Sequence, residues 1–172
     1  MKNKSLNIRT MALTGLMTAL VFVGSRIGFH TPSITGGGYA HLGTAFMFLT
    51  AFLFGRKSAA FAGGVGMGLF DLFSEYFAWA PFTFVISLLM GYTAGKIAFA
   101  ENGSLKISKC IAAAAACTII KVIGYYITEF IFTFNFITPL TSIPGNVTQM
   151  VVGAAVGIAA ATVILKQKIV SV

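Results

Sequence analysis

The chain has 172 residues, of which 57% are hydrophobic and only 9% are charged, with a mean hydropathy of +0.89. Soluble domains usually carry about 25% charged residues, so this composition excludes an ordinary soluble protein and indicates one that faces lipid. The net charge of +8 would otherwise suggest nucleic acid as a partner. Membrane topology accounts for most of the basic residues instead, so we expect no nucleic-acid partner.

Six long apolar runs follow one another along the chain. A bilayer core about 30 Å thick requires about 20 helical residues, and shorter spans suffice where the membrane thins. The runs predict membrane-spanning helices at 8–28, 41–55, 58–76, 80–99, 107–134 and 145–166. The first run imitates a secretory signal but lacks a small-residue cleavage site, so we expect it to be retained. We therefore predict one all-α domain, 1–172, formed by a bundle of six transmembrane helices.

The basic residues near the ends of these runs predict the topology. Ten of the twelve fall on one side of the predicted bundle: Lys2, Lys4, Arg9, Arg56, Lys57, Lys96, Lys106, Lys109, Lys166 and Lys168. Lysine and arginine near span ends collect on the cytoplasmic side. We expect a multi-pass protein of the bacterial inner (plasma) membrane with both termini in the cytoplasm.

The first outer connection, residues 29–40, contains Pro32 and the three glycines 36–38. Because glycine reaches backbone angles that other residues avoid, this segment is equally compatible with a mobile lid and with a loose connector. Tyr76 and Trp79 flank the next outer turn, where an interfacial aromatic belt explains both. Cys110 and Cys117 lie about 10 Å apart by helical rise, which exceeds disulfide reach, so we expect them to be packing residues.

Polar residues recur in the outer half of three predicted spans. Asp71 and Glu75 are four residues apart, Lys121, Tyr125 and Glu129 repeat that spacing, and Asn146 and Gln149 are three apart. Ionisable groups in a membrane are costly unless they are paired or hydrated, so a functional role is the first hypothesis. We predict a polar pocket that binds a neutral or weakly charged solute, formed by Tyr39, His41, Asp71, Glu75, Lys121, Tyr125, Asn146 and Gln149. The alternative is that Lys121 only pairs with Asp71, Glu75 or Glu129, and that Glu75 and Glu129 lie at the water interface.

Small residues four apart occur in three predicted helices: Gly15 with Ala19, Gly64 with Gly68, and Gly153 with Gly157. Such patterns let helices approach closely. Packing within the bundle is the simplest explanation, but the first helix could instead present its small face to another membrane protein.

No catalytic motif is present in the sequence. The segment 91–96 has one residue too few between its glycines for a phosphate-binding loop, and the chain contains neither HExxH nor GxSxG. We expect neither catalytic residues nor a metal site, and therefore no enzyme.

Several segments together resemble a known family, the substrate-binding S components of energy-coupling factor (ECF) vitamin transporters. They are 39–46 (YAHLGTAF), 53–55 (LFG), 62–66 (AGGVG), 71–72 (DL), 80–83 (APFT) and 89–91 (LMG). The sequence is most similar to the riboflavin-type group with its pyridoxine and hydroxymethylpyrimidine relatives. Thr44 and Ser87 depart from the family pattern, which commonly has an acidic residue and a lysine at these positions.

The resemblance implies a protein that binds a vitamin from outside under the first extracellular loop. It implies docking onto a membrane coupling protein (T component) and two ATPase subunits through Ala12, Gly15 and Ala19, with no cofactor in this chain and with ATP and Mg²⁺ used by the ATPases. Pyridoxine or hydroxymethylpyrimidine is the expected substrate. The alternatives are riboflavin or another vitamin, a self-contained ion-coupled transporter that uses the carboxylates, and a structural subunit without a pocket.

Overall fold

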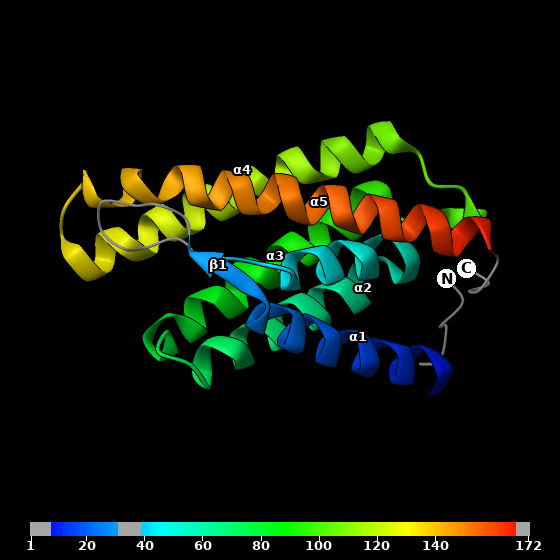
Figure 1. Cartoon of the computed structure of the whole chain (residues 1–172), viewed down its shortest axis with the longest axis horizontal. Helices are drawn as coiled ribbons and strands as arrows, with labels where there is room; N and C mark the ends of the chain where they lie inside the picture. The colour runs from blue at the N-terminus through cyan, green and yellow to red at the C-terminus, as the bar shows by residue number, and fades with distance from the viewer. Residues whose placement is uncertain (1–7, 31–38, 168–172) are drawn as a thin grey trace, which may run out of the picture.

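The computed structural model describes residues 8–30 and 39–167 as a helical bundle (Figure 1). Its long helices are α1 (Ile8–Arg26), α2 (Gly43–Leu72), α3 (Ala80–Ala98), α4 (Ile107–Thr133) and α5 (Ile143–Lys166). Three short 3₁₀ turns, η1 (Phe77–Trp79), η2 (Glu101–Gly103) and η3 (Thr138–Ser142), connect them. Within the described residues, five helices are long and apolar enough to cross a membrane. The predicted all-α class is therefore confirmed, with five candidate spans.

Helix α2 contains both the second and the third predicted spans. Its backbone leaves the helical conformation at Gly55, where φ is 79° and ψ is −174°, a region that essentially only glycine adopts. The two halves then fold back on each other. They pack so closely that a Cβ atom added at Gly63 would lie only 2.9 Å from Cγ of Met47. In Figure 1 the cyan half and the green half of α2 lie side by side.

Glycines let α2 contact its neighbours at backbone distance. A Cβ atom at Gly91 or Gly95 of α3 would overlap the backbone of α2 at Ala59 or Arg56. On α5, Gly153 packs against Thr44 and Gly157 against Phe48. The small-residue pattern on this helix therefore serves internal packing.

The corresponding pattern on α1 faces outward. A Cβ atom at Gly15 would meet nothing within 4 Å, and Ala12 and Ala19 are exposed as well. The other side of α1 packs on α2, where Thr14 Oγ1 donates a 2.9 Å hydrogen bond to Ser58 Oγ. The face Ala12, Gly15 and Ala19 is therefore not used within the described part of the chain.

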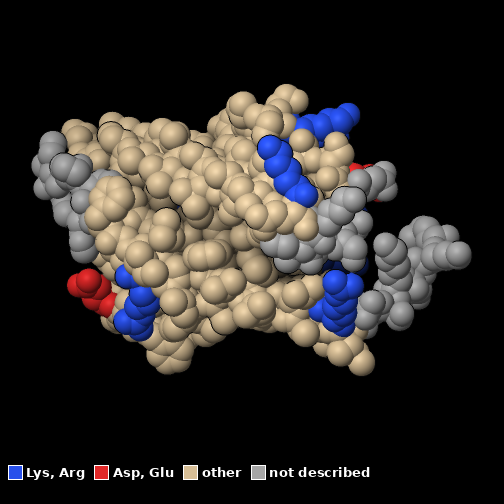
Figure 2. Space-filling model, turned by 45° about the vertical axis from the view of Figure 1, so that its right-hand side comes forward, with Lys and Arg blue, Asp and Glu red and all other residues tan. Residues whose placement is uncertain are grey.

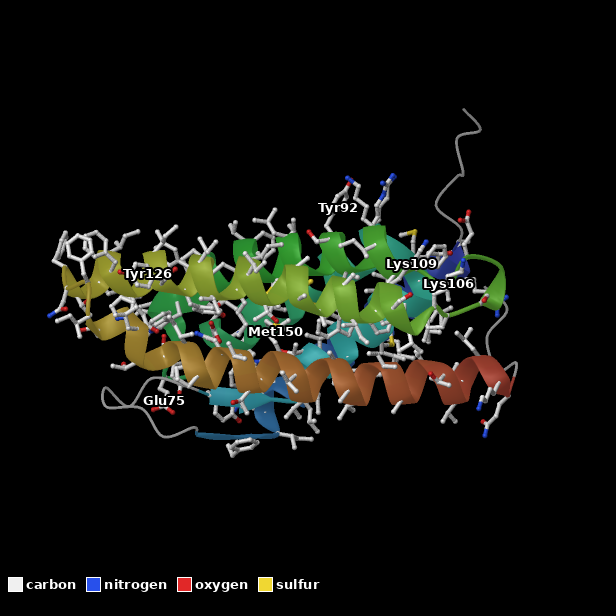
Figure 3. The ribbon with its side chains drawn as sticks, turned by 90° about the horizontal axis from the view of Figure 1, so that it is seen from above. Glu75, Tyr92, Lys106, Lys109, Tyr126 and Met150 are labelled. Carbon is white, nitrogen blue, oxygen red and sulfur yellow. The ribbon has the colours of Figure 1, made fainter. Side chains whose placement is uncertain are left out.

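One end of the bundle holds both the start of α1 and the end of α5 (Figure 1). Lysine and arginine side chains visible in Figure 2 gather mainly at this end. Figure 3 shows Lys106 and Lys109 there, with Glu75 near the opposite end. Lys2, Lys4 and Lys168 lie outside the described residues.

The third predicted span, 58–76, ends earlier than expected. Helix α2 stops at Leu72, where Ser74 Oγ donates to the carbonyl of Asp71 (3.1 Å) and accepts the N–H of Tyr76 (3.2 Å). Local side-chain hydrogen bonds of this kind compete with the helical ladder. Asp71 and Glu75 therefore do not share a helical face.

A small β pair occupies the ends of the first outer connection. Strand β1 (Gly28–His30) runs antiparallel to β2 (Tyr39–His41), with Phe29 opposite Ala40. Residues 31–38, which hold most of the predicted lid or connector, lie outside the described part of the chain. Cys110 and Cys117 are both buried and free, as expected for packing residues.

Candidate functional site

A cavity of about 100 Å³ lies where α2, α4 and α5 meet β2; we call it the site cavity. Its lining residues come from all these elements and their connecting turns: Tyr39, His41, Phe70, Asp71, Tyr76, Trp79, Lys121, Tyr125, Glu129, Ser142, Asn146 and Gln149. The list includes seven of the eight residues that the sequence predicted. Glu75 is the exception, because it is exposed and lies beyond the end of α2.

Aromatic rings form one wall of the site cavity. Tyr39 stacks on Phe70, with ring centroids 5.9 Å apart and an interplanar angle of 12°, and on Tyr76 at 6.2 Å and 24°. Trp79 approaches Tyr125 at 6.1 Å. A wall of this kind suits a flat ring, because aromatic faces and edges pair favourably at such distances.

Lys121 is the cation of the site cavity. Its side chain is 4% exposed, and Nζ lies 4.4 Å from the centroid of the Tyr125 ring. Within the described residues its ammonium makes no hydrogen bond and no ion pair with a carboxylate within 4.0 Å. The ion pair with Asp71, Glu75 or Glu129 that would give Lys121 a structural role is therefore not formed here. All three N–H groups remain available to a ligand.

Two carboxylates face the same space as Lys121. Asp71 is 8% exposed and Glu129 is 9% exposed, and both line the site cavity. Charged groups are seldom buried to this degree without a partner. Asp71 has a side-chain hydrogen bond with Thr83, and Glu129 has one with Ser142. The cavity thus combines the Lys121 ammonium with two carboxylates that are hydrogen-bonded to hydroxyl groups and form no ion pair with it.

Helix α5 contributes amides. Gln149 is 3% exposed, and its Nε2 donates a 2.9 Å hydrogen bond to Thr44 Oγ1. This bond fixes the side chain while the amide oxygen remains able to accept a hydrogen bond. Asn146 lies one helical turn before it and also lines the cavity.

Thr44 and Ser87, where the sequence departs from the pattern that it resembles, do not line the site cavity. Thr44 accepts the hydrogen bond from Gln149, and Ser87 donates to Sδ of Met67 at 3.1 Å. Both side chains are buried. Thr44 therefore acts on the site through Gln149.

His41 separates the site cavity from a second cavity of about 190 Å³, which lies between the β pair and α5. Gln149 lines both cavities too. Burial, followed by the charge of Lys121, lowers the pKa of His41 to about 3, so its imidazole is neutral at physiological pH. Its Nδ1 atom is buried and has no hydrogen-bond partner among the described residues.

The sequence did not assign Phe70, Tyr76, Trp79 or Ser142 to the site. Tyr76 and Trp79 were explained by an interfacial belt, and the same residue types serve both roles. Burial, followed by the charge of Glu75, raises the pKa of Tyr76, so its hydroxyl stays protonated. The early end of α2 brings Tyr76 and Trp79 over the cavity, and no sequence motif indicates this.

Curated proteins similar in sequence to this chain include two relatives that each match part of it. A curated relative from Lactococcus lactis subsp. cremoris (strain MG1363), the thiamine precursor transporter HmpT, is 34% identical over 96 residues, which are 55% of this chain and 56% of that protein. An uncharacterized protein in the gap 3′ region of Pyrococcus woesei is 33% identical over 94 residues, 55% of this chain and 61% of that protein. The chain therefore aligns with little more than half the length of these two relatives.

A family model covers far more of the chain. The model of the ECF-type riboflavin transporter S component matches residues 5–166, which include all five long helices and every residue that lines the site cavity. The family consists of transport subunits rather than enzymes. With nearly its whole length matched, the chain belongs to the ECF-type riboflavin transporter S component family.

Proposed function

We propose that this chain binds a vitamin or vitamin precursor with a single aromatic ring, of the hydroxymethylpyrimidine or pyridoxine type, and delivers it to an ECF importer. The observation that carries the proposal is the combination, in one cavity, of an aromatic wall, the buried Asp71 carboxylate and the buried Lys121 ammonium, which has no ion-pair partner within 4.0 Å. Buried polar groups normally have partners. A ligand with both donors and acceptors on a flat ring would supply them.

Hydroxymethylpyrimidine fits this chemistry. Its amino group can donate to Asp71, its ring nitrogens or hydroxyl can accept from Lys121, and its ring can lie on the aromatic wall of Tyr39 and Phe70. The similarity to the HmpT thiamine precursor transporter supports the same substrate class.

Cavity size also favours a small ligand. Pockets for drug-sized molecules measure about 300–1,000 Å³, whereas the site cavity holds about 100 Å³. A single ring is therefore a better match than the three fused rings of riboflavin.

The proposed topology has six spans with both termini in the cytoplasm. Residues 43–54 of α2 form a half-helix of about 18 Å, short for a span but tolerable where the membrane thins. Gly55 joins this half to residues 56–72 next to Arg56 and Lys57. The basic end of the bundle would face the cytoplasm by the positive-inside rule, and the site cavity would open to the outside.

The proposed partners are a membrane coupling protein and two ATPase subunits, which would use ATP and Mg²⁺. The chain itself has no nucleotide-binding motif. The outward face of Ala12, Gly15 and Ala19 on α1 offers a smooth surface for another membrane helix.

Titration calorimetry on the purified chain, without ATPases, tests the ligand assignment. We expect saturable binding of hydroxymethylpyrimidine or pyridoxine and much weaker binding of riboflavin. Mass spectrometry of the ligand released from gently purified protein provides an unbiased check. Tight riboflavin binding without either smaller compound would reject the single-ring proposal, and binding that requires ATPases would reject the independent binding subunit.

A further inference from the structure

Arg26, the last residue of α1, joins this helix to the wall of the site cavity. Its guanidinium carbon lies 5.8 Å from the centroid of the Phe22 ring and 5.7 Å from that of Phe70. Its Nη2 donates a 3.3 Å hydrogen bond to the carbonyl of Phe73, where α2 ends. The carbonyl of Arg26 accepts a 3.2 Å hydrogen bond from the hydroxyl of Tyr39. We call these four contacts the Arg26 clasp.

The clasp touches the aromatic wall directly. Phe70 and Tyr39 both line the site cavity, and they stack on each other. Tyr39 also lies 5.6 Å from His41, measured between ring centroids. One residue of α1 is thus connected to the rings that would hold a ligand, although α1 itself contributes no lining residue.

A simpler role for Arg26 explains only part of this geometry. A basic residue in the last turn of a helix is favoured by the helix dipole, and arginine is common at membrane interfaces. Neither effect requires the guanidinium to lie over two rings or to bond the end of another helix. A planar guanidinium can make these contacts together, whereas the ammonium of lysine is a single compact donor.

We propose that Arg26 is a positioning residue that holds the aromatic wall of the site cavity to α1, so that the position of α1 and ligand retention are coupled. The proposal rests on the proposed function, because it assumes that the cavity binds a ring-shaped ligand. Coupling between two sites requires a shared element that both of them bias. Here that element is α1, which carries the outward small face at Ala12, Gly15 and Ala19 and the clasp at its last residue, Arg26.

The test compares Arg26→Ala and Arg26→Lys with a matched control, Arg56→Ala. Arg56 also lies over a ring, with its guanidinium carbon 5.5 Å from the centroid of Tyr92, but neither residue lines the site cavity. The control therefore removes the same kind of contact away from the cavity.

The first measurement, hydrogen exchange of backbone amides, needs no ligand. We expect Arg26→Ala to speed exchange about tenfold in β2 and in the last turn of α1, because it removes cation–π contacts that each slow local opening modestly. Exchange in α4 should not change. The second measurement is the dissociation rate of hydroxymethylpyrimidine, which should rise about 5- to 30-fold in Arg26→Ala and less in Arg26→Lys. Arg56→Ala should change neither quantity.

Unchanged exchange in β2 together with an unchanged dissociation rate in Arg26→Ala would overturn the clasp. Equal effects of Arg56→Ala would also overturn it, because they would indicate general destabilisation. If the wild-type chain does not bind hydroxymethylpyrimidine, the ligand proposal fails, and the exchange measurement still decides the clasp. Should Arg26→Ala not fold, Arg26→Lys and Tyr39→Phe serve the same comparison, because Tyr39→Phe removes only the hydroxyl bonded to the Arg26 carbonyl.

Discussion

Gln149 combines a fixed side chain with a free acceptor at the boundary of both cavities. Leaving a ligand group unpaired in a buried site costs about 1–3 kcal/mol, so Gln149→Ala should weaken ligand binding roughly 5- to 150-fold. Asn146→Ala should have an effect in the same range. The control is Thr148→Ala, because Thr148 is exposed on the same helix. Calorimetry that found near-native affinity for both cavity variants would remove α5 from the site.

Substitution of Lys121 distinguishes a ligand-binding role of this residue from a structural one. A buried ammonium without an ion-pair partner does not stabilise the fold, so Lys121→Met should leave the thermal unfolding temperature unchanged or raise it. The same variant should lose about 10- to 150-fold in ligand affinity, since a charge-assisted hydrogen bond contributes about 1.5–3 kcal/mol. Lys109→Met, at the exposed start of α4, should change neither. A marked loss of stability in Lys121→Met would favour the structural role.

Sequence reasoning found the polar residues of the cavity because ionisable groups are expensive in a membrane. Aspartate and lysine are rare in apolar runs, so Asp71 and Lys121 could each be recognised as a candidate site residue on its own. Phe70 and Trp79 could not be recognised, since aromatic residues are common in every span of this chain. The predicted span 58–76 included Glu75, whereas α2 ends at Leu72. This bound was wrong because the hydrogen bonds of Ser74 that end the helix leave no clear signal in the sequence.

At the scale of elements, Gly55 decides the path of α2. The sequence predicted two spans separated near Gly55, Arg56 and Lys57, and the structure reverses the chain at Gly55 alone. A connecting loop was unnecessary, because one glycine with positive φ can turn a helix back. The β pair was not predicted at all, since its strands have only three residues each, too few for a detectable alternation.

Gly55→Ala should destabilise the protein by about 1–3 kcal/mol, because an L-residue at a φ of 79° is strained. Gly15→Ala is the matched comparison: this glycine is helical with nothing within 4 Å of its added Cβ. It should leave stability unchanged or raise it by about 0.5–1 kcal/mol. Thermal unfolding in detergent measures both. Equal stability of the two variants would show that the reversal at Gly55 does not depend on glycine.

At the scale of the whole molecule, the polar cavity and the small face of α1 use different residues. No residue of α1 lines the site cavity, and Ala12, Gly15 and Ala19 face away from the described bundle. Ligand binding and partner docking can therefore be altered separately, apart from the link that Arg26 provides at the end of α1.

Bulk on the small face should separate binding from transport. Gly15→Leu or Ala19→Leu adds a side chain where close helix contact requires none, so ATP-driven uptake should fall at least about tenfold while ligand affinity stays near native. Each variant is reconstituted in vesicles with the coupling protein and ATPases, and both quantities are measured on one preparation. Gly153→Leu is the contrasting variant, because Gly153 packs against Thr44, the partner of Gln149, and should lose affinity together with uptake. Full uptake by both α1 variants would place the docking surface elsewhere, whereas loss of affinity in them would mean that the face supports internal packing.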